Sequence, residues 1–132
     1  MKSLFFLFAF AITSLLSCNS RNHASDIQVI DSNDSSMTLN ITDQKPEYAA
    51  IYHLLFRGIP NSNQTTPLIS TSEETTEKQF PEYFKKLFNE NRYKTFVTSS
   101  SKNGNGSQRV VVNTRALRLD LEQNSIIRKF GY

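Results

Sequence analysis

Alternating apolar and polar positions, together with β-branched residues, predict four strands that pair as two hairpins. The first hairpin joins residues 27–30 to residues 37–42 through a turn rich in Asp, Asn and Ser. The second joins residues 93–99 to residues 109–113, and the Asn/Gly run at 101–106 supplies residues that tolerate positive φ at a hairpin tip. The pattern therefore predicts a small antiparallel sheet.

Three helices are predicted from apolar residues spaced by three and four. The first begins at Pro46, since proline fits the first turn of a helix, and it ends at Gly58. The second has Pro81 in its first turn, and the third is capped by Thr114. Residues 61–76 are mostly polar and are predicted to be a connection that is pinned to the core by one apolar pair.

The order of these elements, β-β-α-α-β-β-α, groups strands and helices and so predicts the α+β fold class. We expect a small, mainly antiparallel sheet with about three helices packed on it. The length fits a single domain, which we place at residues 27–132. The apolar closing segment 126–132 is expected to be an edge strand, either on the domain's own sheet or added to the sheet of a partner.

The first seventeen residues have the pattern of a signal peptide that is removed. Lys2 provides a positive charge, residues 4–12 form an apolar run, and a small residue, Ser17, precedes Cys18. The apolar run is shorter than the roughly 20 residues that a helix needs to span a bilayer. A retained membrane helix is therefore the weaker interpretation.

At residues 15–18, Leu-Leu-Ser-Cys, the chain resembles the lipobox of bacterial lipoproteins. The resemblance implies cleavage between Ser17 and Cys18, a diacylglycerol on the Cys18 thiol and a further acyl chain, such as palmitate, on the new amino terminus. It also implies a cell-envelope location, and Asn19 after the cysteine favours the outer membrane, facing the periplasm. The alternative is a chance cysteine at the end of an ordinary secretory signal.

Residues 18–26 are small and polar and are predicted to be a flexible tether between the lipidated cysteine and the domain. From Tyr48 onward the chain resembles a group of small lipoproteins of Bacteroidota that have no activity to transfer. The segments that carry this resemblance are residues 54–60, 67–69, 93–101 and 126–132. It supports membership of a family and a location only.

Catalytic and metal-binding motifs are not found in the sequence. There are two histidines, His23 in the tether and His53 in the first helix, and the single cysteine, Cys18, is expected to be consumed by acylation. We expect His53 to lie at the surface or boundary of the domain, and Glu73, Glu74 and Glu77 to be solvated. No enzyme activity, cofactor or metal is predicted. An envelope hydrolase would need a convergent polar pocket, and we expect none.

Charge is distributed unevenly along the chain. Residues 18–91 hold six basic and ten acidic residues, whereas residues 92–132 hold eight basic and two acidic ones, although the whole chain carries only +3. The residues in this basic region that we expect to bind an anionic partner are Arg92, Lys94, Arg109, Arg115, Arg118, Arg128 and Lys129.

The function predicted from these features is that of a lipid-anchored, non-catalytic binding or accessory subunit of the envelope. Besides the membrane that holds the lipid, the expected partners are an envelope protein, peptidoglycan or anionic lipid head groups; nucleic acid is not expected. Two alternatives stay open, namely an envelope hydrolase with an unrecognised site and a structural spacer. The basic residues, in turn, either form a binding surface or pair with the acidic half of the same domain.

Overall fold

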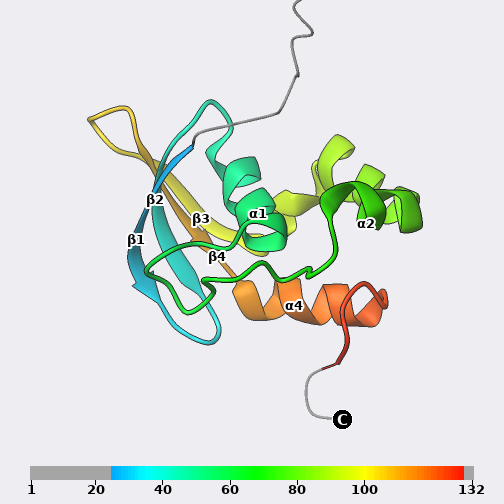
Figure 1. Cartoon of the computed structure of the whole chain (residues 1–132). Coiled ribbons are helices and arrows are strands. Elements are labelled where there is room, and N and C mark those ends of the chain that lie inside the picture. Colours follow the sequence, from blue (N-terminus) through cyan, green and yellow to red (C-terminus); the bar gives the residue numbers. More distant parts are fainter. Residues whose placement is uncertain (1–24, 130–132) are drawn as a thin grey trace, which may run out of the picture.

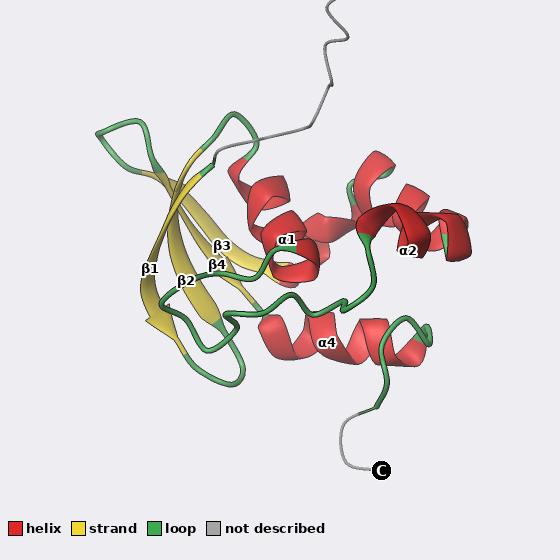
Figure 2. Ribbon diagram, in the orientation of Figure 1, coloured by secondary structure: helices red, strands yellow, loops and turns green. Residues whose placement is uncertain are grey.

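A computed structural model describes residues 25–129 of the chain, and its core is a four-stranded antiparallel sheet. The strands are β1 (Asp26–Ser32), β2 (Met37–Thr42), β3 (Val97–Lys102) and β4 (Gln108–Val112), in the spatial order β1-β2-β4-β3. The helices lie on one side of this sheet (Figures 1 and 2). The predicted α+β class and both hairpins are confirmed.

The strand register places alternate residues of the central strands in the core. Leu39 of β2 pairs with Val110 of β4, and Met37 pairs with Val112; all four side chains are buried. Because successive side chains of a strand point to opposite faces, residues such as Arg109 lie on the other face of the sheet. That face is mostly polar, no helix of residues 25–129 covers it, and Arg109 is exposed on it (Figure 2).

Helix α1 (Pro46–Phe56) packs against β2 and β4. Pro46 begins it as predicted, and Gly58 follows its end with φ of +78°. The buried face includes Ala50, Ile51 and Leu54, at the spacing that points side chains to one side of a helix.

The connection after α1 is partly helical, which the sequence pattern did not predict. Its apolar pair contacts α1 as expected, since the amides of Leu68 and Ile69 donate to the carbonyls at the end of that helix. Helix α2 (Glu73–Gln79) then begins, so the prediction of a connection at 73–76 is wrong. The Ser72 hydroxyl accepts a hydrogen bond from the Thr75 amide and caps this helix, which has too few apolar residues to show a periodic pattern.

The predicted second helix consists of two short pieces. Helix α3 (Pro81–Phe84) has Pro81 in its first turn as predicted, and it continues into the π-helical turn η1 (Lys85–Asn89). After Asn91, which has a positive φ, the 3₁₀ turn η2 (Arg92–Phe96) occupies the start of the segment predicted to be a strand. The predicted strand at 93–99 therefore begins only at Val97. The buried residues Tyr93 and Phe96 are three apart, and this spacing suits a 3₁₀ turn better than an alternating strand.

Helix α4 (Thr114–Gln123) closes the fold, and its cap is one residue earlier than predicted. The side chain of Asn113 accepts from the Ala116 amide, so Asn113 rather than Thr114 is the cap. After α4, Ile126 and Ile127 pack against the core without forming a strand, so the edge strand predicted here is wrong for the described residues, 126–129.

The described part therefore has four α-helices instead of about three. Strand β1 begins at Asp26, which was predicted to be the last residue of the tether. The predicted signal peptide, Ser17, Cys18 and most of the tether lie outside the described residues, as do residues 130–132. Among residues 25–129, no helix is both long enough and apolar enough to cross a bilayer.

Candidate functional site

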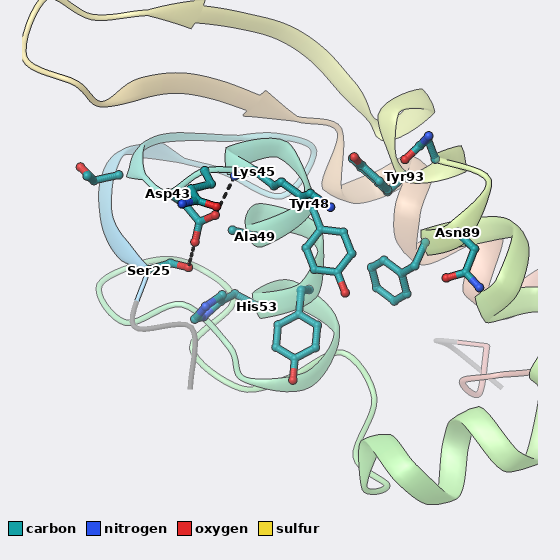
Figure 3. A pocket seen from close by; sticks show the side chains of 13 residues that line it. Ser25, Asp43, Lys45, Tyr48, Ala49, His53, Asn89 and Tyr93 are labelled. Atoms are coloured by element: carbon teal, nitrogen blue, oxygen red, sulfur yellow. Dashed lines mark hydrogen bonds between the residues drawn. The ribbon is translucent and has the colours of Figure 1, made fainter. Parts of the chain in front are cut away.

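One hollow of the domain, which we name the aromatic hollow, has a volume of about 980 Å³. Three separate segments form it: Ser25 with the β2–α1 turn (residues 42–45), one face of α1, and residues 88–93 (Figure 3). Its floor is aromatic and its rim is polar. Such a mixture of ring faces and a few polar groups is typical of small-ligand sites.

Tyr48 is the central ring of this hollow. Its ring lies 6.2 Å from that of Tyr52 at an interplanar angle of 9°, 4.9 Å from Phe88 and 5.6 Å from Tyr93. The Tyr52 hydroxyl donates a 2.5 Å hydrogen bond to the Glu73 carboxylate. Burial and this acceptor raise the pKa of Tyr52, so the phenol keeps its proton.

Glu73 was expected to be solvated, and the structure corrects this. It lies at the start of α2, is half-buried and accepts the hydrogen bond from Tyr52. Glu74, in contrast, is exposed and pairs with Lys78 across one helical turn.

Polar groups surround the aromatic floor. The Ser25 hydroxyl donates to the Asp43 carboxylate at 2.6 Å, and the other oxygen of Asp43 accepts from the Lys45 amide at 2.7 Å. Asn89 lies across the hollow from Asp43 (Figure 3), and Asn91 also lines the hollow. Within residues 25–129, the side chains of Lys45, Asn89 and Asn91 make no hydrogen bond.

His53 lies at the wall of the aromatic hollow, half-buried at the boundary of the domain as predicted. Burial lowers its pKa below the ordinary 6.5; the nearby Arg57 lowers it further, and Asp43 acts in the opposite direction. The expectation that no such pocket exists is therefore wrong. The Ser25 hydroxyl, however, donates to Asp43 and not to the imidazole, an order of contacts that differs from a nucleophile–base–acid chain.

Arg92, the first residue of the predicted basic set, is held within the domain. Its guanidinium donates two hydrogen bonds to Asp120, at 2.5 and 3.1 Å, and lies over the rings of Tyr83 and Phe96. The hydrogen bonds to Asp120 raise the pKa of Arg92. Arg92 therefore pairs within the basic region itself, and not with the acidic half of the domain.

Two other arginines of the set line a second hollow, which we name the basic hollow. Arg118 of α4 and Arg128 line it together with the connection at 64–71 and Ile126, and its volume is about 680 Å³. Arg118 also donates to the side-chain oxygen of Gln64 at 2.8 Å. The remaining members, Lys94, Arg109, Arg115 and Lys129, are exposed and line neither hollow.

Sequence reasoning missed the aromatic hollow because its residues are far apart in the chain. The one local signal is the spacing of Tyr48 and Tyr52 by four, which is equally the spacing of a helix face packed in the core. Both side chains are half-buried and lie beside the buried face of α1.

Neither hollow holds a group of acidic, histidine or cysteine side chains suited to a metal ion, within the part of the chain that the structure describes. Comparison of the chain with protein-family models, with curated proteins and with solved structures gives no match.

Proposed function

We propose that this chain is a lipid-anchored, non-catalytic binding protein of the cell envelope, located at the periplasmic face of the outer membrane. It is anchored through Cys18 and recognises anionic groups with its basic C-terminal region, 92–132. The anchor rests on the Leu-Leu-Ser-Cys segment at 15–18 and on the polar residues that follow it. Two or more acyl chains hold a protein at a bilayer stably, whereas one does so only reversibly.

The observation that carries the binding function is that Arg118 and Arg128 both line the basic hollow. They come from α4 and from the segment after it, and no acidic side chain is among the residues that line this hollow. Guanidinium groups form paired hydrogen bonds with carboxylate or phosphate oxygens, so two of them at one site favour an anion. Peptidoglycan peptides and anionic lipid head groups both offer such oxygens.

We place the anion site in only part of the basic region 92–132. Arg92 contributes to the structure through Asp120, and Arg109 lies on the polar face of the sheet, away from α4. A hydrolase is less supported because Ser25 and Asp43 bond each other, and a spacer does not account for two arginines at one hollow.

The proposal is tested in two parts. The intact mass of the membrane-extracted chain should correspond to a protein that starts at Cys18 and carries acyl chains, and the Cys18→Ala variant should lose them and leave the membrane fraction. An unacylated wild-type product overturns the anchor.

The soluble Cys18→Ala variant then serves to measure binding without the anchor. We expect it to sediment with vesicles that contain phosphatidylglycerol or with purified peptidoglycan, and the arm that binds identifies the source of the anion. Adding Arg118→Gln and Arg128→Gln should weaken binding at least about tenfold, since each basic residue near an anionic surface contributes about 1 kcal/mol. Removing two charges elsewhere, with Lys94→Gln and Arg109→Gln, is the matched control. Equal losses in both double variants overturn the basic hollow as the site.

A further inference from the structure

The aromatic hollow takes no part in the anchor or in the anion site, yet its rings are held in place before any ligand arrives. Tyr48 contacts the rings of Tyr52, Phe88 and Tyr93, and Tyr52 is tied to Glu73 through its hydroxyl. Tyr93 is buried, whereas Tyr48, Tyr52 and Phe88 are half-buried and retain exposed surface at the hollow. A ligand therefore meets a floor of ring faces that needs no rearrangement, which lowers the cost of binding.

The rim of the hollow carries side-chain hydrogen-bond donors and acceptors that have no partner within the described residues. Asn89 ends the π-helical turn η1, Asn91 follows with φ of +59°, and both residues line the hollow. Each amide has two donors and an acceptor, and within the described residues neither has a partner. Lys45 adds an ammonium group on the other side (Figure 3).

The charge of the hollow is nearly balanced. Asp43 and Lys45 carry opposite charges, and the carboxylate of Asp43 is already engaged by Ser25 and by the backbone of Lys45. The imidazole of His53 is held towards its neutral form by burial. Lys45 is the one lysine or arginine side chain that lines the hollow, which is little positive charge for a strongly anionic ligand. Within residues 25–129 there is also no group of acidic, histidine or cysteine side chains that could hold a metal ion. The balance favours a neutral, polar ligand.

We propose that the aromatic hollow is a saccharide-binding site that takes pyranose rings of a neutral oligosaccharide. The C–H face of a pyranose is weakly positive and complements the negative face of an aromatic ring, while its hydroxyls both donate and accept, as side-chain amides do. The volume of about 980 Å³ has room for more than one sugar ring. Only the envelope origin of the saccharide rests on the proposed anchor; binding itself is independent of Cys18.

Tyrosine emission gives a local readout of binding. The chain has no Trp and five Tyr, of which Tyr48, Tyr52 and Tyr93 line the hollow. Titration of the detergent-solubilised full chain with the N-acetylglucosamine trimer and with maltotriose should change this emission. Calorimetry should give a Kd of about 1 mM or tighter for at least one of them. Adenosine, which also stacks on rings, should bind at least about tenfold more weakly.

The variants separate stacking from hydrogen bonding. Tyr52→Ala should weaken saccharide binding at least about tenfold, and Tyr52→Phe, which keeps the ring, should retain most of it. Because loss of Tyr52 also removes packing, the exposed Asn89→Ala provides an independent test and should weaken binding at least about threefold. Tyr83→Phe, outside the hollow, is the matched control and should bind as the wild type does.

Three results would overturn the proposal. They are absence of binding by either saccharide up to about 10 mM, tighter binding of adenosine than of both saccharides, and unchanged affinity in both Tyr52→Ala and Asn89→Ala. Each of these can occur whether or not Cys18 is acylated and whether or not the basic hollow binds anions, so the test stands apart from that of the proposed function.

Discussion

His53 occupies a position where two influences on its charge oppose each other. Burial and the positive charge of Arg57 disfavour the imidazolium, and the carboxylate of Asp43 favours it. The first pair prevails, so the pKa of His53 lies below 6.5 in the folded chain. The native state therefore holds this side chain neutral at a pH where an unfolded chain begins to protonate it.

This shift predicts a loss of stability in mild acid. As the pH falls below 6.5, the unfolded chain binds a proton at His53 that the folded chain does not yet bind, so the free energy of unfolding decreases until the folded pKa is reached. Urea unfolding of the wild type and of His53→Gln, at pH 7.5 and at pH 5, measures this contribution. The decrease should be larger in the wild type; equal decreases in the two proteins would contradict the assigned direction.

Single residues also show where sequence reasoning reached its limit. Pro46, Gly58 and Pro81 were assigned correctly because their roles follow from their own backbone chemistry. The contact of Arg92 with Asp120 could not be predicted from the sequence, because it joins residues 28 positions apart. A charge count carries no such information.

Among the elements, the end of α1 depends most clearly on one residue. Gly58 adopts φ of +78°, and a Cβ placed there would lie 2.2 Å from the carbonyl oxygen of Thr65. The same region holds the return of the chain, since the Ile59 amide donates to the Gln64 carbonyl. The turn after α1 therefore requires a residue without a side chain, for conformation and for space.

Gly58→Ala is accordingly expected to lower the free energy of unfolding by about 3 kcal/mol, which combines the strain of positive φ with the clash against Thr65. Chemical denaturation followed by circular dichroism measures it. Gly104→Ala is the matched control, because nothing lies within 4 Å of a Cβ there, and it should change stability by less than about 0.5 kcal/mol. A comparable loss in both variants would refute this account of Gly58.

Elements with a clear period could be predicted from the sequence, and those without one could not. Strands β2 and β4 and helices α1 and α4 each bury a regular set of apolar residues. Strand β1 packs Ile27 and Val29, two residues apart, partly buried against the same core. Helix α2 is mostly polar and depends on its cap and on tertiary contact, as Thr76, its one buried residue, indicates. The π and 3₁₀ turns have no sequence period long enough to detect.

At the scale of the whole molecule, one polar cluster ties three distant elements together. Asp120 of α4 accepts hydrogen bonds from the Tyr83 hydroxyl of α3, at 2.6 Å, and from the Arg92 guanidinium of η2. Burial and this contact raise the pKa of Tyr83, which keeps its proton for Asp120. The cluster holds the C-terminal helix to the middle of the chain.

Asp120→Ala should therefore destabilise the fold by about 2 kcal/mol. Removal of the carboxylate leaves two half-buried donors, Tyr83 and Arg92, without an acceptor. The decrease in stability is smaller than for a fully buried ion pair because the Arg92 side chain is 37% exposed. Glu74→Ala, which removes the exposed pair with Lys78, is the control and should cost less than about 0.5 kcal/mol. Urea titrations of both variants decide the matter, and equal losses would mean that the cluster adds little.

The central pairing of β2 with β4 has a consequence for how this chain acquires its structure. Each hairpin closes between neighbouring residues, but Met37 finds Val112 only across the intervening helices. A chain made from its amino terminus therefore contains its first hairpin and α1 well before β4 has been synthesised. Until then Leu39 and Ile41 lack the residues of β4 with which they pair. Because distant closure costs more entropy than local closure, docking of the two hairpins is the expected slow step of folding.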